Sequence, residues 1–313
     1  VADEYTYKGL DSGGLAQTGP TLQNPIYRTL QAKLDDVVSV KDFGAKGDGI
    51  TDDTAAVQRA LTNALAVNQF AEGQYHRGIL FPAGSYKLTS TLKVPPYTMI
   101  LGEGKRSSYL IGSFEGPLVE LMDSFGQTGY DFFKPNASGN YPYNIEYHFL
   151  DIAFWHLNET TRNFPCVVID GGFGVYFERC FLGGNKFQNS GDGFSDAECF
   201  DIDQGNGASL IHIRNLSGYD YVRDVVITQC DILYHNYGVE INNGVRGVNI
   251  TDCFLYDLNR GVIVGNLTID PAYKPHSISV SNNWFYHISN EGLATKEDIW
   301  GVISNSNWYT YTG

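Results

Sequence analysis

The sequence contains no run of 18 consecutive apolar residues and no apolar core within its first 20 residues. The first absence argues against a membrane-spanning helix, and the second argues against a signal peptide in Val1–Pro20. Positive charge is also scarce, because 21 Lys and Arg face 35 Asp and Glu, for a net charge of −14. We therefore expect neither nucleic acid nor a membrane as the partner, although a local site could still bind an anionic polysaccharide.

The five cysteines form neither a disulfide framework nor a zinc motif. Five cannot all pair within the chain, and their irregular, wide spacing fits no zinc pattern. We interpret them as buried thiols of a protein assembled in a reducing compartment, and we expect no metal and no cofactor. The residues are Cys166, Cys180, Cys199, Cys230 and Cys253.

Glycine is abundant, with 35 residues, whereas Leu-rich helical patterns are missing after residue 70. This combination favours β-structure with tight turns. The exception is a strand and glycine-rich turn that deliver Thr51, Asp52 and Asp53 as N-cap candidates for a helix from about Thr54 to Val67. Apolar residues at i, i+3 and i+4 spacing give that helix one apolar face, which the open end of a β-solenoid could receive.

The run VSVKDFGAKGDGITDDTAAVQRAL, residues 38–61, resembles the opening motif of the pectate-lyase-superfamily parallel β-helix, in the form found in bacteriophage tailspikes. Residues 78–88, 92–94 and 99–104 resemble the first coils of that family, so the strong resemblance covers residues 37–112. The resemblance implies a right-handed fold, a neck or connector before the coils, and a homotrimer.

An internal repeat supports the same architecture. Val225–Ile232 aligns with Val248–Leu255, Ile278–Phe285 is a third copy, and Val175–Leu182 is an earlier one. A period in the low twenties without intervening helices indicates a parallel β-helix. In this register one internal position holds Cys180, Cys230, Cys253 and Asn283, and the next position faces outward with Phe181, Asp231, Phe254 and Trp284.

We predict an all-β protein, a right-handed single-stranded parallel β-helix over residues 37–313, with an N-terminal capping α-helix at Asp53–Val67. Residues 1–36 would be an N-terminal connector or neck segment, with a short amphipathic helix candidate at Ile26–Leu34. The strand-like run at 307–311 has no cap, which predicts that the β-helix is truncated at its C-terminal end.

Two breaks in the period mark candidate functional loops. About 20 extra residues fall at Gly183–Gly207 and about 10 at His287–Asp298. We expect both to leave from one corner of the coil and to form the walls of a trough.

Carboxylates near this trough are the catalytic candidates. The first insertion supplies five: Asp192, Asp196, Glu198, Asp201 and Asp203. Glu240 faces outward on a strand beside the trough, and Asp257, in the short turn at the trough floor, is the alternative catalytic carboxylate. Outward carboxylates one or two coils apart span the separations of about 5 to 9.5 Å that glycosidases use. The competing interpretations are a solvated acidic loop or a calcium site for the insertion, and a merely solvated side chain for Glu240.

Aromatic rings stack on sugar rings, so Phe254 and Trp284 are the candidate substrate platform. An exposed Trp could equally mark a subunit interface. His235, Arg260 and His287 lie near the same corner and are further substrate-binding candidates.

The leading hypothesis is a tailspike depolymerase in the phage virion that hydrolyses a polysaccharide at the bacterial surface. It would attach to the phage tail or baseplate through its N-terminal segment. The Gly-His-Gly string of polygalacturonases is absent, which argues against pectin hydrolysis. A polysaccharide lyase on the same fold is the second hypothesis, with its base sought among His212, Arg214, Arg223 and Arg260. A non-catalytic glycan-binding adhesin or structural tail protein is the third.

Overall fold

The computed structural model describes residues 4–6, 27–29, 37–68, 77–122, 145–157, 164–184, 209–215, 222–242, 244–265, 274–295 and 299–310. The chain divides into two compact units, Val1–Val38 and Ser39–Gly313. The predicted boundary, after residue 36, lies close to this division.

In the first unit, β1 (Glu4–Thr6) and β2 (Tyr27–Thr29) form an antiparallel pair. The predicted helix at Ile26–Leu34 is therefore wrong over the start of its range. Tyr and Thr favour extended backbone, and here the cross-strand pairing with β1 outweighs the weak helical pattern.

The second unit is built of parallel strands that form two sheets, and the larger one bends at a corner within its long strands into two faces, which we call sheet 1 and sheet 2; the smaller one is sheet 3. In sheet 1 the order is β4 (Asp48–Asp52), β6 (Gly84–Leu88), β9 (Ser108–Gly112), β12 (Ala153–His156), β15 (Phe181–Gly184), then the first halves of β18 (Asp231–Ile241), β20 (Phe254–Val264) and β22 (Trp284–Thr295), then β24 (Trp308–Thr310). In sheet 2 the order is β7 (Leu92–Val94), β10 (Val119–Leu121), β13 (Val167–Asp170), β16 (Ser209–Arg214), then the second halves of β18, β20 and β22.

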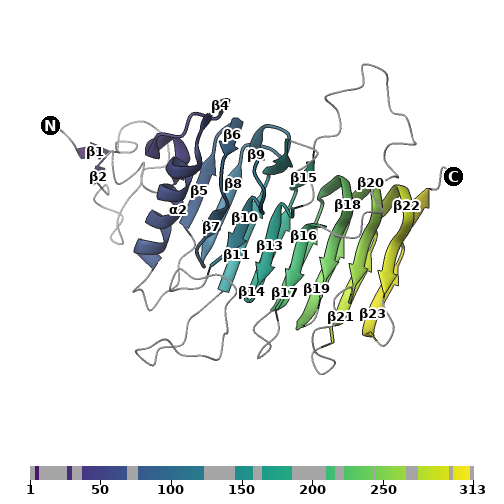
Figure 1. Cartoon of the computed structure of the whole chain (residues 1–313). Helices are drawn as coiled ribbons and strands as arrows, with labels where there is room; N and C mark the ends of the chain where they lie inside the picture. Colours follow the sequence, from purple (N-terminus) through teal and green to yellow (C-terminus); the bar gives the residue numbers. More distant parts are fainter. Residues whose placement is uncertain are drawn as a thin grey trace, which may run out of the picture. The chain divides into compact units, whose positions relative to one another are not determined.

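Sheet 3 contains β3 (Val38–Ser39), β5 (Arg77–Phe81), β8 (Thr98–Gly102), β11 (Ile145–Leu150), β14 (Phe173–Glu178), β17 (Val222–Thr228), β19 (Val245–Thr251), β21 (His276–Ser281) and β23 (Trp300–Asn305). Every pairing within sheets 1, 2 and 3 is parallel, and neighbours in space are one coil apart in sequence, as the stacked arrows of Figure 1 show. The predicted parallel β-helix is confirmed.

The register confirms the predicted repeat. Val225 pairs with Val248 and Ile227 with Ile250, at the offset that the sequence predicts, and Val248 pairs with Ile278. The cysteine column is also present, because the backbone N–H of Cys180 donates to Cys230 Sγ at 3.4 Å. Farther along the column, the Cys253 N–H donates to the Oδ1 of Asn283 at 2.9 Å. On that coil the side-chain amide of Asn283 takes the place of a cysteine sulfur as the acceptor.

These cysteines are core residues. Cys166, Cys180, Cys230 and Cys253 are buried free thiols, whereas Cys199 lies outside the described ranges. Burial raises the pKa of the Cys166 thiol, which keeps it protonated.

The chain turns between sheets 3 and 1 at single residues with left-handed backbone. These residues stack from coil to coil and have φ values of 51° to 57°: Asp151, Arg179, Gln229, Asp252, Asn282 and Ser306. A second row of left-handed residues marks the corner between sheets 1 and 2: Tyr234, Asp257 and His287. Asp and Asn adopt this conformation more readily than most residues. At Arg179, Tyr234 and His287 the strand pairing with the neighbouring coils holds the backbone in it.

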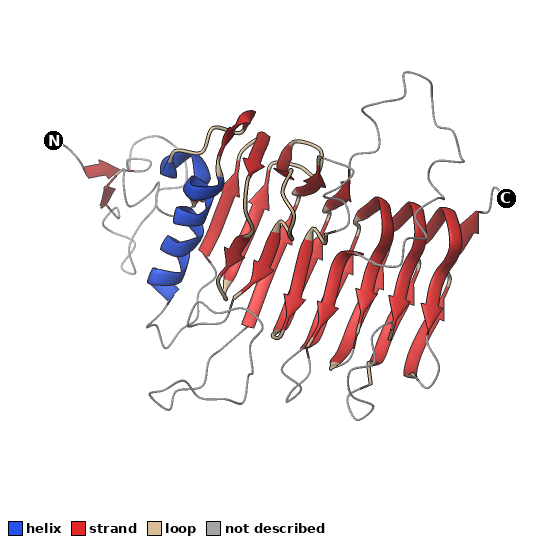
Figure 2. Ribbon diagram, in the orientation of Figure 1, coloured by secondary structure: helices blue, strands red, loops and turns tan. Residues whose placement is uncertain are grey.

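Helix α2 (Thr54–Asn68) is the only α-helix in the described part of the chain and lies against the first coil, as Figure 2 shows. Its buried residues are Ala56, Val57, Ala60 and Leu61, as the sequence predicts; the side chains from residue 64 onward lie outside the description. Within the described residues, no helix is long and apolar enough to cross a membrane.

Two of the predicted N-cap residues have different roles. Asp52 Oδ1 accepts a hydrogen bond from the backbone N–H of Thr54 at 3.0 Å, at the start of α2. The buried carboxylate of Asp53 instead accepts from the backbone N–H groups of Lys46 and Gly47, at 2.7 and 2.9 Å. Asp53 therefore fixes the glycine-rich turn against the helix.

A column of glycines lies inside the last described coils. A Cβ atom on Gly261 would stand 2.4 Å from a ring carbon of Phe285 and 2.6 Å from the carbonyl oxygen of Gly292. The ring of Phe285 stacks on Tyr309, with centroids 5.0 Å apart. The absence of side chains at Gly261 and Gly292 makes room for this stacked pair.

Candidate functional site

The corner between sheets 1 and 2 brings a carboxylate and an imidazole together. Asp257 and His287 occupy equivalent positions on β20 and β22, and His287 Nδ1 lies 3.2 Å from Asp257 Oδ1. The Asp257 side chain is 6% exposed and that of His287 is 19% exposed. Tyr286 stacks on the His287 ring, with centroids 3.9 Å apart.

This pair has the chemistry of an acid–base centre. A neutral imidazole that donates from Nδ1 to a carboxylate leaves its Nε2 lone pair available as a proton acceptor. The carboxylate also stabilises the imidazolium that forms when Nε2 accepts a proton. Backbone strain alone does not mark the corner as functional, since the corner between sheets 3 and 1 carries the same left-handed conformation.

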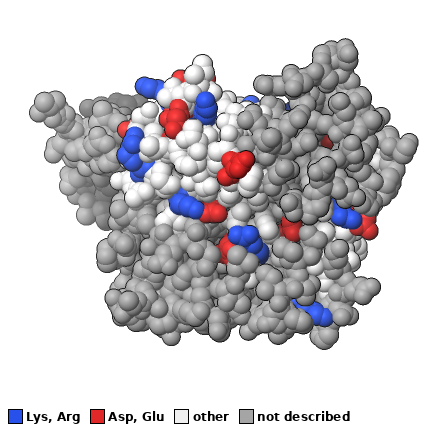
Figure 3. All heavy atoms as spheres, viewed as in Figure 1, with Lys and Arg blue, Asp and Glu red and all other residues white. Residues whose placement is uncertain are grey.

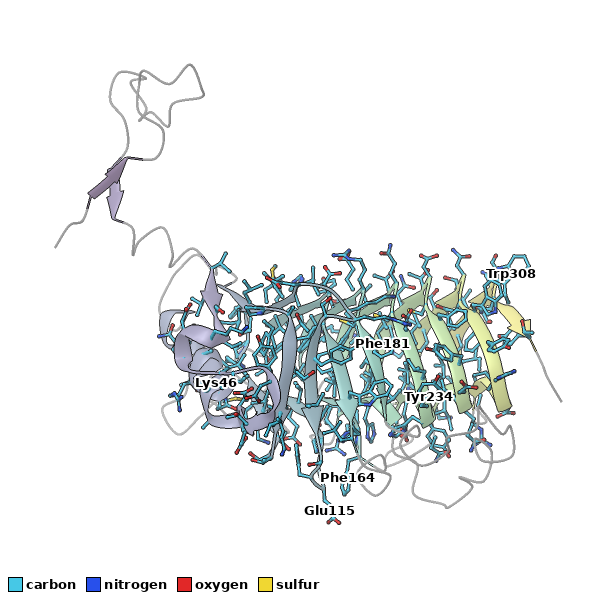
Figure 4. The ribbon with its side chains drawn as sticks, turned by 90° about the horizontal axis from the view of Figure 1, so that it is seen from above. Lys46, Glu115, Phe164, Phe181, Tyr234 and Trp308 are labelled. Carbon is cyan, nitrogen blue, oxygen red and sulfur yellow. The ribbon has the colours of Figure 1, made fainter. Side chains whose placement is uncertain are left out.

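An aromatic row runs along sheet 1 beside this corner. Phe254, Trp284 and Trp308 pair in register on β20, β22 and β24, and the Phe254 and Trp284 rings have centroids 5.8 Å apart. Trp284 is 48% exposed and Trp308 is 68% exposed, so both side chains are open to solvent. We call Phe254, Trp284 and Trp308 the aromatic platform; Figure 4 labels Trp308 at the last described coil.

Arg260 lies on the sheet 2 side of the corner, in the next outward row. Its Nε donates to Glu291 at 3.1 Å, and its guanidinium carbon stands 5.8 Å from the Tyr237 ring centroid. The structure thus places the predicted residues Asp257, His287, Arg260 and Trp284 on two adjacent strands, β20 and β22.

Glu240 lies on the outward row of sheet 2, but it is buried rather than solvated. Only 1% of its surface is exposed, and Asn242 Nδ2 donates to its Oε1 at 3.1 Å. The same Asn242 Nδ2 lies 2.9 Å from His212 Nε2, and His212 pairs with Glu240 across β16 and β18. The expectation of an open outward carboxylate is therefore wrong at Glu240, because a polar network and neighbouring groups shield it.

An ion pair between Arg214 and Asp170 lies beside this network. Arg214 Nε donates to Asp170 Oδ2 at 2.9 Å, and Asp170 is 6% exposed. Burial lowers the pKa of His212, the Arg214 charge lowers it further, and Glu240 and Asp170 oppose both effects. The imidazole is neutral near pH 7, as its bond to the Asn242 amide requires.

His235 does not face the surface. It is 2% exposed and shares its row with Leu258 and Ile288, which are also buried. The left-handed backbone of Tyr234 interrupts the alternation of inward and outward side chains just before His235, so the His235 side chain points inward. The expectation that His235 contacts substrate is not supported by its place in the core.

The predicted trough is wrong on one side. Residues 284–295 form strand β22, which pairs with β20 with one register shift, so no loop leaves the corner there. The additional residues of this part of the chain lie instead between Val264 and His276, after β20. Asp192, Asp196, Glu198, Asp201 and Asp203, from the other predicted wall, lie outside the described residues.

Sequence reasoning missed Asp170 and Asn242 as partners in the site. The segment between β15 and β16 interrupts the regular offset of the repeat, so alignment within the chain does not place β13 beside β16. The sequence suggests His212, Arg214 and Arg223 only as candidate bases, and the structure places Arg223 on sheet 3, over the ring of Phe173. Alternation alone did predict that the residue at 240 faces outward.

Charge of both signs is dispersed over the described surface seen in Figure 3. Among the described residues, no group of three or more His, Cys, Asp or Glu could hold a metal ion.

Comparison with known proteins agrees with the fold. Residues 37–138 match the family model described as rhamnogalacturonase A/epimerase, pectate lyase-like. The match covers the first coils alone, and the stacked parallel strands of the described residues show the fold, a parallel β-helix.

Its relatives include phage appendages and glucanases. A glucan 1,3-beta-glucosidase of Cochliobolus carbonum is 38% identical over 105 residues, 31% of this chain and 12% of that protein. The preneck appendage protein of Bacillus phage PZA is 32% identical over 90 residues, 29% of this chain and 8% of that protein. The N-terminal fragment of bacteriophage phi29 gene product 12 superposes with a TM-score of 0.47 at 15% identity, covering 88% of this chain and 53% of that one. The chain thus spans between 8% and 53% of these relatives.

Proposed function

We propose that this protein is a bacteriophage tail appendage that binds a bacterial surface polysaccharide and cleaves it by hydrolysis. One observation carries the proposal: the Asp257–His287 pair and the Phe254–Trp284 platform lie on the same two strands, β20 and β22. A platform for sugar rings next to an acid–base pair is the arrangement that glycan cleavage requires. The similarity of 29–31% of the chain to a phage appendage and a glucan 1,3-beta-glucosidase supports the assignment.

In this proposal each residue has a defined role. Phe254 and Trp284 hold the sugar rings by stacking, and Arg260 donates hydrogen bonds to substrate hydroxyls. His287, held by Asp257, donates a proton to the glycosidic oxygen as the glycosidic bond breaks. A second carboxylate is needed for hydrolysis; the acidic residues of 192–203 are the candidates that the sequence offers, because Glu240 is buried.

A lyase is the second candidate, because the base is an imidazole held by a carboxylate. His287 Nε2 could remove the C5 proton of a uronic acid, while Arg260 binds the sugar carboxylate. This reaction needs no second carboxylate.

One assay separates the functions. The protein is incubated with purified capsular and O-antigen polysaccharides, and chain length is followed by size-exclusion chromatography together with ultraviolet absorbance of an unsaturated uronate. Shortening without new absorbance supports hydrolysis, and shortening with absorbance supports the lyase. Binding without shortening would make the protein an adhesin and would overturn the enzymatic proposal.

We also propose that the protein acts as a homotrimer in the phage virion, attached to the tail or baseplate through residues 1–36. The exposed aromatic residues Trp284 and Trp308 would suit either a glycan or a subunit contact. Analytical ultracentrifugation of the full-length protein tests the trimer, and a monomer at micromolar concentration would refute it.

A further inference from the structure

The turn between β8 and β9 reaches across the outer face of sheet 1. Lys105 Nζ lies 2.9 Å from Asp231 Oδ1, and Arg106 Nη2 lies 3.5 Å from Asp231 Oδ2. Asp231 begins β18, and two strands, β12 and β15, separate β18 from β9. The turn therefore crosses two coils to bring two cations to one carboxylate.

Asp231 stands in the row that becomes the aromatic platform. Phe181, Asp231 and Phe254 pair in register on β15, β18 and β20, and Trp284 follows on β22. The guanidinium carbon of Arg106 stands 4.9 Å from the Phe181 ring centroid, a cation–π contact that orients it. Arg106 is thus held in the same row as the platform, on the side of the earlier coils. Figure 4 labels Phe181 along the middle of the coils.

The charges at this position do not cancel. Two cations face the single carboxylate of Asp231, whose side chain is 17% exposed, while the Arg106 side chain is 63% exposed. A guanidinium has five N–H donors, and the distance of 3.5 Å to Asp231 is at the long end for a hydrogen bond. Arg106 can therefore donate to a further anion from the solvent side.

The net charge of −14 does not prevent such binding. Screening limits the reach of distant charges to roughly 8–10 Å in physiological salt. Among the described residues, the polar groups close to Arg106 or to its carboxylate partner are Lys105, Asp231 and Tyr256. The guanidinium of Arg106 lies close enough to Tyr256 to act on its hydroxyl, and the ring of Tyr256 lies against Phe254 of the platform.

We propose that Arg106 determines specificity at the platform by binding an acidic group, a carboxylate or a phosphate, on a polysaccharide whose sugar rings stack on Phe254 and Trp284. The inference rests on the proposed glycan-binding role of the platform and adds the class of sugar chain that it selects. Bidentate donation from a guanidinium gives both the charge and the geometry for such a group.

Affinity electrophoresis with defined polymers tests the proposal. Polygalacturonate supplies carboxylates, yeast phosphomannan supplies phosphates, and dephosphorylated mannan and dextran are the neutral probes. The wild-type protein should bind at least one acidic probe about tenfold more tightly than its neutral counterpart, and less tightly as salt increases. The carboxylate and phosphate arms show which group is selected.

Three variants and one control, Lys41→Gln, separate recognition from a merely structural role of the turn. Arg106→Gln should abolish the preference for the acidic probe and leave neutral binding unchanged, whereas Lys41→Gln, an exposed cation near α2, should change neither. Arg106→Lys should restore part of the preference. Asp231→Asn removes the anchor of the turn but also a negative charge, so acidic binding should be kept or strengthened; a structural role would weaken it.

The outcomes distinguish this inference from the proposed function. Neutral and acidic probes bound equally by the wild type, or an unchanged preference in Arg106→Gln, would overturn the role of Arg106 alone. Loss of all glycan binding in Trp284→Ala would still support the platform in that case. No binding of any probe by the wild type would overturn both the platform and the inference.

Discussion

Gln58 of α2 and Lys93 of β7 exchange two hydrogen bonds across the end of the solenoid. Gln58 Nε2 donates to the Lys93 carbonyl oxygen at 2.9 Å, and the Lys93 N–H donates to Gln58 Oε1 at 2.9 Å. One amide side chain thus replaces a preceding strand at the first strand of sheet 2. This protects polar backbone groups that would otherwise present an open sheet edge.

Gln58→Leu should destabilise the protein, because both backbone groups of Lys93 lose their partner. We expect a loss of about 1–3 kcal/mol in the free energy of unfolding, measured by urea denaturation. Thr62→Ala, which removes a hydroxyl on the exposed side of the same helix, is the matched control and should cost less. Equal effects of the two substitutions would show that the helix, rather than the amide, protects the edge.

Asp257→Asn should reduce polysaccharide cleavage by about 10² to 10⁴-fold, because an amide cannot stabilise the imidazolium of His287. Glycan binding to the platform should change little. Asp224→Asn, at an exposed position on sheet 3, is the control and should keep wild-type kinetics. A fully active Asp257→Asn enzyme would exclude this pair from the chemistry.

Two buried histidines should make the protein sensitive to acid. Burial lowers the pKa of His156 below its usual 6.5, and burial lowers the pKa of His212 as well. The unfolded chain then binds protons at a pH where the folded protein does not. Stability is therefore complete above about pH 6.5 and is lost as the pH falls toward the folded-state pKa values.

Urea unfolding at pH 7.5 and pH 5 measures this loss, which is about 1.4 kcal/mol for each unit by which a pKa is lowered. His156→Gln should be less stable at pH 7.5 but should lose less on acidification. Ile79→Val, a core change without a titrating group, should keep the wild-type difference between the two pH values. The same difference in His156→Gln would rule out His156 as a source of the acid sensitivity.

Gly261→Ala should disrupt the last coils, because its methyl group would overlap Phe285 and the Gly292 carbonyl. Backbone cannot move aside without breaking the parallel pairing, so we expect a loss of about 2 kcal/mol or more, or failure to fold. Gly78→Ala is the control: its nearest neighbour is the movable end of Leu101, at 3.1 Å. Thermal unfolding followed by circular dichroism compares the two variants.

Much of the fold could be predicted from the sequence because a solenoid repeats its own constraints. The rows of Val225 with Val248 and of Cys230 with Cys253 follow from one offset, since inward side chains on stacked coils must match. The capping helix was predicted because its apolar spacing is local. Strand β22 was mistaken for a loop because Asn, Glu and Gly between 290 and 292 resemble a turn, whereas pairing with β20 keeps them extended.

The site was only partly predictable, because the repeat gives the direction of a side chain but not its contacts. Alternation places Phe254 and Trp284 side by side on the outer face, and the structure agrees. The direction of a side chain, however, does not reveal what covers it, so the burial of Glu240 could not be anticipated. The Arg106–Asp231 contact joins residues far apart in the sequence through a turn, and no periodic pattern encodes it.

The matched register of the coils makes the coil itself the unit of evolutionary change. Because Val225 and Val248 are equivalent, a duplication of the segment from one to the other would insert a new coil with every inward position already compatible with its neighbours. An insertion of a single amino acid within a strand would instead exchange the inner and outer faces of everything after it in that strand. A lineage of such proteins can thus grow longer or shorter in whole coils, extending or shortening an aromatic row such as Phe254, Trp284 and Trp308 without rebuilding the core.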